Sequence, residues 1–548
     1  MSDPTPPVVP PHPSRPPEPH QHVPPTAPHP AGQGWDSPPE APSRFVPPAP
    51  GQVPGPAHAP AHTPVPAHAP VPTRAPAPGY GAPRVVYVKP DPKVRRGPVR
   101  ARERVLAPDL ARGLCLLFIA LANTPVYLWA ANRSDLMSTH PEAEGPLDSL
   151  VQFLVHTVID ARTYPLFALL FGYGMIQLFT RQVAGGTSES GARRLLLKRN
   201  GWLILFGFVH ALLLFSGDIL GAYGLAGLLL AALFLRASDK VMMIVVLCLV
   251  GLQVLGTLGF VGLFALLAAI PTDVTGGVPL TDPSTAGLEI TTPIGDIGME
   301  NYLLAMLWRV GQFAIALPMQ VLMLTVPTMM LLGMWAARKR ILEDPARHRR
   351  LLWTTALVGI AIGWIGALPG SLGHLGVLDL DWYGMPDTFV HTTTGMAAGA
   401  GYAALFGLLG GALSRRATAR AEERDAAEAR ATDPSGGTSG PLPAPASGLH
   451  PGPASGSHPG PRGLTWAIVA VGKRSLSCYL LQSVLCAPVL AAWGLGLGAD
   501  LTSATMAAYA VAVWLLTMVF ACVLEVLGKK GPAEVLLRRL TYGPAAKG

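Results

Sequence analysis

Ten long apolar stretches, separated by loops of alternating charge, constrain this 548-residue chain more than any other feature. Each stretch is long enough to cross the hydrocarbon core of a bilayer, which takes about 20 helical residues. The sequence therefore predicts an all-α, polytopic membrane helix bundle of about ten transmembrane helices. The stretches cover residues 110–131, 150–180, 199–216, 219–235, 241–269, 310–336, 351–370, 391–413, 466–493 and 503–527.

The charges of the loops predict how the bundle is oriented. The loops at 271–308 and 371–391 carry Asp and Glu and contain no Lys or Arg. Basic loops stay on the cytoplasmic side of a membrane. We therefore expect a multi-pass membrane protein with both termini in the cytoplasm. The basic segments are 89–104, 181–199, 236–240, 338–350, 415–474 and 529–539.

Two segments differ in composition from the membrane-spanning part. Residues 1–100 are rich in Pro, Ala and His and cannot bury enough apolar area to offset the entropy of ordering, which predicts a disordered cytoplasmic tail. Such a tail could also bind an adaptor protein or a metal ion. A charged and then Gly/Pro/Ser-rich cytoplasmic linker covers 414–463. It separates a membrane domain of eight helices (104–413) from the last two helices and a C-terminal cytoplasmic motif (464–543).

The remaining composition argues against several classes of protein. The net charge of +8 is concentrated where cytoplasmic loops meet the membrane, which indicates contact with the lipid bilayer rather than with nucleic acid. All five cysteines lie in apolar stretches, where we expect them to pack as small hydrophobic side chains. The sequence has no phosphate-binding Gly-Lys-Ser/Thr loop and no H-E-x-x-H motif. ATP-driven transport is thus disfavoured, and we expect no bound cofactor or metal.

His210 is the most informative polar residue inside an apolar stretch. Ionisable groups in lipid are costly, about 2.5–3.5 kcal/mol at a helix centre on translocon scales, so each one needs a reason. His210 falls in the outer half of the third stretch, and Asp218 follows at the next turn of the chain. An imidazole oriented by a carboxylate is a general base, so we predict a catalytic pair. The alternative is a His that only hydrogen-bonds a neighbouring helix.

Other polar residues predict a binding site on the outer side. Asp109 and Arg112 stand one turn apart at the start of the first helix, where they can pair, and near the other end of the chain Glu525 can pair with Lys529. Several further groups lie toward the outer ends of stretches and could line an outward-facing polar cavity. The candidate substrate-binding residues are Arg112, Asn123, Arg162, Arg309 and His391.

Several motifs together resemble the YeiB-like bacterial membrane proteins, a family of unknown function (domain of unknown function 418). They are Asp109-Leu-Ala-Arg-Gly113, Leu166 to Gly174, Gly207-Phe-Val-His210 with Gly217 to Gly224, Gly472 to Ser483, and Gly531 to Gly543. The resemblance covers about 104–543 apart from the linker. It implies a protein of the bacterial plasma membrane.

The opening helix is also distantly similar to that of membrane acyltransferases that modify extracellular glycans. In those enzymes an Asp-x-x-Arg-Gly motif is followed, eleven residues after the Arg, by an essential His. The same count from Arg112 reaches Asn123, whose amide cannot accept a proton, so His210 would have to supply the base. The resemblance implies an acyltransferase-like enzyme that acts on an envelope glycan, lipid or small metabolite at the outer face, with an acyl donor. A transporter or flippase of a small polar substrate, or a non-catalytic membrane scaffold, is the alternative.

Overall fold

The computed structural model describes residues 106–133, 139–271, 273–274, 295–432 and 463–543. Within these ranges all regular structure is helical, which confirms the predicted all-α class. Eight of the described helices are long and apolar enough to cross a membrane. The predicted tail (1–100) and most of the predicted linker (433–462) lie outside the described residues.

Each of the ten predicted stretches contains a helix. The first half of the chain supplies α1 (Leu106–Ala122), α2 (Thr124–Tyr127), α3 (Pro146–Leu154), the π-turn η2 (Val155–Ile159), α4 (Thr163–Ala184), α5 (Glu189–Leu213), α6 (Leu220–Leu233) and α7 (Asp239–Ala268). The second half supplies η4 (Asp296–Gly298), α8 (Tyr302–Leu322), α9 (Thr325–Arg338), α10 (Arg349–His374), η5 (Asp381–Tyr383), α11 (Gly384–Thr432), α12 (Gly463–Lys473), α13 (Ser475–Leu490), η6 (Leu497–Ala499), α14 (Ser503–Val526) and α15 (Pro532–Tyr542).

Four of the predicted stretches are broken rather than continuous, and the first of them, 110–131, is divided between α1 and α2. The stretch 310–336 forms α8 and α9, which meet at Leu324 with φ of 63°, a left-handed conformation that is rare for a residue with a large side chain. The stretch 466–493 forms α12 and α13. The stretch 150–180 begins inside α3 and then passes through the π-turn η2 before α4. Single π-turns occur often at functional sites.

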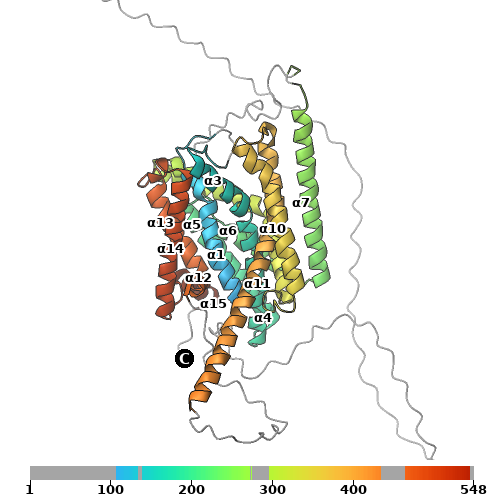
Figure 1. The fold of residues 1–548 in the computed structure, drawn as a ribbon, viewed down its shortest axis with the longest axis vertical. Helices are drawn as coiled ribbons and strands as arrows, with labels where there is room; N and C mark the ends of the chain where they lie inside the picture. The colour runs from blue at the N-terminus through green and yellow to red at the C-terminus, as the bar shows by residue number, and fades with distance from the viewer. Residues whose placement is uncertain (1–105, 134–138, 272, 275–294, 433–462, 544–548) are drawn as a thin grey trace, which may run out of the picture. The chain divides into compact units, whose positions relative to one another are not determined.

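The helices pack in neighbouring pairs around α1. α10 packs along α11, α4 along α9 and α5 along α6, while α1 contacts α4, α11, α12 and α14. In Figure 1, α13 and α14 lie on one side of α1, and α10 and α7 lie on the other. α4 and α9 approach closely because Gly333 has no side chain, and a Cβ there would overlap the carbonyl of Leu169.

The outward faces of several helices are apolar. On α7, Leu255 and Leu266 are 69% and 65% exposed, and α8, α10 and α14 expose Leu, Ile and Val in the same way. Side chains such as Leu170 and Met330 fill the interior of the bundle. Apolar side chains on both the inside and the outside are what a bilayer requires of a spanning helix. The chain is a multi-pass membrane protein.

The C-terminal part is tied to the α12–α13 junction by two carboxylates. Glu525 pairs with Lys473 at 2.5 Å and with Arg474 at 2.6 Å. The predicted pairing of Glu525 with Lys529 was therefore wrong. The α12–α13 junction, more than 50 residues earlier in the chain, places Lys473 and Arg474 beside this carboxylate instead. Glu534 of α15 accepts hydrogen bonds from the backbone N–H of Leu476 and Ser477.

Candidate functional site: a histidine-lined cavity

A cavity of about 1390 Å³ lies where several helices end or break. Its walls come from the end of α1, η2, the start of α4, the middle of α7, the α8–α9 break, the end of α10, the start of α11 and Tyr479 of α13. It exceeds the roughly 300–1,000 Å³ that is typical of small-molecule pockets. One part of the wall is apolar (Leu252, Met319, Leu322, Met323, Leu324), and another carries ionisable groups (His140, His156, Asp160, His374, Asp387, His391).

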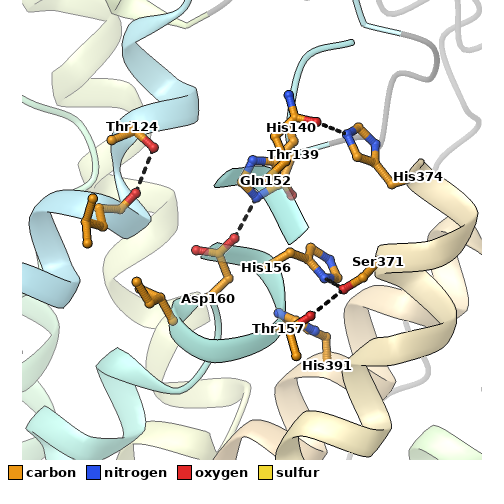
Figure 2. A network of polar contacts seen from close by, with 12 residues as sticks. Thr124, Thr139, His140, Gln152, His156, Thr157, Asp160, Ser371, His374 and His391 are labelled. Carbon is orange, nitrogen blue, oxygen red and sulfur yellow. Dashed lines mark hydrogen bonds and ion pairs between the residues drawn. The ribbon is translucent and has the colours of Figure 1, made fainter. Parts of the chain in front are cut away.

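The first ionisable pair in the wall is His140 with Asp160. His140 Nε2 lies 2.7 Å from Asp160 Oδ2, and both residues are buried (Figure 2). Asp160 follows the π-turn directly, and the next residue, Ala161, has φ of 54°. This backbone break ends η2 and starts α4, so it places the carboxylate at the cavity wall. A carboxylate on one ring nitrogen fixes the tautomer and orientation of the imidazole, which is the arrangement of a general base.

The second group in the wall is centred on His156 of η2. Its Nδ1 lies 2.8 Å from Ser371 Oγ, which also contacts Thr157 Oγ1 at 3.0 Å (Figure 2). Its Nε2 lies 3.3 Å from Asp387 Oδ2, in the first turn of α11. The ring of His391, one helical turn after Asp387, has its centroid 4.2 Å from that of His156. Three elements thus bring two imidazoles and a carboxylate together.

Arg162 lies behind His391 rather than in the cavity wall. Its side chain is fully buried, and its Nη1 lies 2.6 Å from His391 Nε2. Its Nη2 donates to the carbonyl of Gly363 at 2.5 Å. Arg162 therefore supplies a fixed positive charge next to the histidines.

Two further groups complete the polar wall. His374 Nε2 lies 3.1 Å from Gln152 Oε1, and the His374 ring centroid lies 6.0 Å from that of His140. Burial, reinforced by the negative charge of Asp387, raises the pKa of the Tyr383 phenol to about 12. Tyr383 therefore stays protonated at neutral pH and can donate a hydrogen bond.

The predicted pair His210 and Asp218 forms a separate buried cluster. His210 Nδ1 lies 2.8 Å from Asp218 Oδ1, and its Nε2 lies 2.8 Å from Ser483 Oγ of α13. The order carboxylate, imidazole and hydroxyl matches that of a Ser-His-Asp triad. His210, Asp218 and Ser483 are not among the described residues that line the cavity. The cluster nevertheless adjoins the cavity, because Gly217 and Ile219 line it, as does Tyr479, whose ring centroid lies 5.1 Å from that of His210.

The other predicted site residues are divided between the cavity and the framework. Asn123 and His391 line the cavity. Arg112 instead pairs with Asp109 at 3.0 Å near the start of α1. Arg309 pairs with Asp296 at 3.1 Å, with both side chains fully buried, so it holds η4 against α8.

Sequence analysis missed His140, His156, His374 and Asp387. His140, His374 and Asp387 lie outside the predicted stretches. His156 lies in an apolar stretch, four residues before Asp160. A signal was available in the concentration of His and Asp at the same predicted end of the bundle. The contacts among these residues could not be predicted from the sequence, because contacts such as that of His156 with Ser371 join residues more than 200 positions apart.

Comparisons with known proteins identify relatives of unknown function. A family model described as "Protein of unknown function (DUF418)" matches residues 456–544. The chain is 27% identical to Uncharacterized protein YeiB of Escherichia coli (strain K12) over 465 residues, which is 81% of this chain and 98% of that protein. It is 27% identical to Uncharacterized protein YxaH of Bacillus subtilis (strain 168) over 289 residues, 49% of this chain and 66% of that protein.

A shorter match has higher identity. The chain is 33% identical over 133 residues to an uncharacterized 39.9 kDa protein in the amylase 3′ region of Bacillus acidopullulyticus, which covers 24% of this chain and 35% of that protein. No solved structure matches the chain. The family match and the full-length similarity agree with the motifs in the first and last helices. The chain is thus a multi-pass membrane protein that is similar to YeiB over most of its length and matches the DUF418 family model over residues 456–544.

Proposed function

We propose that this protein is an acyl-transfer enzyme of the bacterial plasma membrane that acts on an amphiphilic envelope glycan, lipid or metabolite at the outer face. One observation carries the proposal: a single large cavity combines an apolar wall with His–carboxylate pairs. An acyl chain fits the apolar wall, and a polar head group fits the ionisable one. The loop charges support an outer location, because the segment 371–391 that borders the cavity contains no Lys or Arg.

The geometry favours His140 as the base that meets the substrate. With Asp160 accepting from Nε2–H, the Nδ1 atom is the nitrogen that takes a proton. His140 would remove the proton of an acceptor hydroxyl as its oxygen attacks the acyl carbonyl. The new acyl–oxygen bond then forms, the acyl–donor bond breaks, and the imidazolium returns the proton to the leaving group. Asn123 and the protonated Tyr383 provide hydrogen-bond donors for the developing oxyanion.

His210 is the alternative base for the same reaction. Its Asp218 and Ser483 partners have the order of a catalytic triad, and its ring contacts that of Tyr479, which lines the cavity. A reaction at Ser483 would need neighbouring side chains to move, because Ser483 is buried and does not line the cavity. His140 needs no such movement because it already lines the cavity.

One observation favours transport as a second candidate function. The cavity reaches the break between α8 and α9 at Leu324, and discontinuous helices often form the substrate sites of transporters. A transporter would move an amphiphile through the cavity without changing its covalent structure.

Mass spectrometry of envelope lipids and glycolipids distinguishes the two functions. The comparison uses cells that lack the protein, cells with the intact protein, and cells with His140→Gln. An acyl-transfer enzyme produces a species whose mass differs from its precursor by one acyl group, only in cells with the intact protein. An identical set of species in cells with and without the protein would overturn the enzymatic proposal and favour transport.

A further inference from the structure

We propose that His156, Asp387 and His391 bind a divalent transition-metal ion of the zinc type at the wall of the cavity. One ligand atom from each residue lies within 4.8 Å of the others. Two imidazoles and one carboxylate form a common three-ligand set for zinc in catalytic sites, and they leave a coordination position open for water or substrate. This inference concerns metal content and does not depend on the proposed acyl transfer.

The distance between His156 and Asp387 matches two ligands of one ion. His156 Nε2 and Asp387 Oδ2 are 3.3 Å apart. A charge-assisted hydrogen bond between such atoms is shorter, about 2.7–2.9 Å. Two ligands on a tetrahedral zinc ion lie about 3.3 Å apart, given metal–ligand bonds of about 2.0 Å. A metal ion accounts for this separation better than a direct hydrogen bond does.

The supporting contacts also match those of a metal site. Ser371 Oγ holds Nδ1 of His156 at 2.8 Å, which leaves Nε2 as the ligand atom. Partners of this kind orient most metal-binding histidines. Asp387 and His391 lie one helical turn apart on α11, so their side chains project from the same face.

Asp387 carries an unsatisfied oxygen, which is the strongest single indication of a missing ligand. Its Oδ1 is buried and has no hydrogen-bond partner among the described residues. A buried acceptor without a partner is destabilising, and a metal ion bound by both carboxylate oxygens of Asp387 would satisfy it. Gly370 provides the room for this oxygen, because a Cβ at that position would overlap it.

The local charge allows a cation despite the nearby Arg162. Two carboxylates, Asp160 and Asp387, and one guanidinium, Arg162, contact the histidines, so with neutral imidazoles the cluster carries one net negative charge. Binding of a divalent ion changes the net charge of the cluster from −1 to +1. Hydroxide or an anionic substrate in the cavity would neutralise it.

Metal analysis of the full chain tests the inference. The protein is purified in detergent, stripped with a chelator, reloaded with Zn²⁺ and analysed for bound metal, and Co²⁺ alone is titrated as a spectroscopic probe. We expect His156→Gln, Asp387→Asn and His391→Gln each to bind one Zn²⁺ ion fewer per chain than the wild type. Gly370→Ala removes no ligand but displaces the carboxylate, so we expect Zn²⁺ affinity about 10–100-fold weaker.

His374→Gln is the matched control, since it removes a histidine of the same cavity that lies outside the proposed ligand set. It should bind as much Zn²⁺ as the wild type. The histidines of residues 1–100 are present in every variant and cancel in the comparison. Two results would overturn the inference: equal Zn²⁺ binding by the wild type and His156→Gln, or a wild-type Co²⁺ spectrum that Asp387→Asn leaves unchanged.

Discussion

Neutralising Asp296 should destabilise the protein more than most single substitutions. Asp296 Oδ2 accepts from Arg309 Nη1 at 3.1 Å, Asp296 Oδ1 accepts from Ser216 Oγ at 2.6 Å, and both charged side chains are fully buried. Asp296→Asn keeps the shape but leaves the Arg309 charge without a counterion, which typically costs about 3–5 kcal/mol. The Tyr302 and Trp493 rings, 5.2 and 5.5 Å from the guanidinium, offset about 0.5–2 kcal/mol through cation–π interaction.

We therefore expect Asp296→Asn to lower the free energy of unfolding by about 3 kcal/mol. Equilibrium unfolding in mixed detergent micelles measures this change. Glu343→Gln is the control, because its partner Arg340 is 75% exposed and such pairs contribute about 0–1 kcal/mol. A loss of less than about 1 kcal/mol for Asp296→Asn would refute the reasoning that the pair is a buried structural anchor.

Two other predictions address the alternative base and the orientation. If His210 is the base, His210→Gln abolishes the envelope modification but lowers the free energy of unfolding by no more than about 1–2 kcal/mol. If the Ser483 hydroxyl is the nucleophile, Ser483→Ala has the same effect. If cells with His210→Gln and cells with Ser483→Ala both still carry the full amount of the envelope modification, measured by mass spectrometry, His210 serves only as a contact between helices. A reporter enzyme fused after residue 380 should be active outside the cell and one fused after residue 345 inside it, and a cytoplasmic signal at 380 would refute the predicted orientation.

The helical fold was largely predictable because stretch length and apolar composition act locally. The interruptions of the helices could not be predicted in the same way. Leu324 sits in an apolar run between Pro318 and Pro327, and hydropathy alone predicts one continuous helix there. Its left-handed backbone depends on how α8 and α9 pack against other helices. The π-turn before Asp160 is likewise invisible to a pattern of apolar residues.

The cavity was predictable only in part. Asp109 with Arg112 and His210 with Asp218 are close in sequence, so their pairing could be expected from helix geometry and a tight turn. Asn123 and His391 were expected to line a polar cavity, and both line this one, while its outer location stays a prediction. The contact between His156 and Asp387 joins η2 to α11 across more than 200 residues, and tertiary packing alone determines it.

The most direct test of the central claim is whether the cavity binds an amphiphile. Gly256 of α7 lines the cavity with open space around it, so Gly256→Trp should fill that space without disturbing the helix. Gly259 lies on the same helix, also with open space, but is absent from the cavity lining, so Gly259→Trp is the matched control.

Mass spectrometry of small molecules that co-purify with each protein gives the readout. We predict the same amphiphile with the wild type, His140→Gln and Gly259→Trp, and its loss from Gly256→Trp. An equal amount of that amphiphile with Gly256→Trp and with the wild type would contradict the assignment of this cavity as the substrate site.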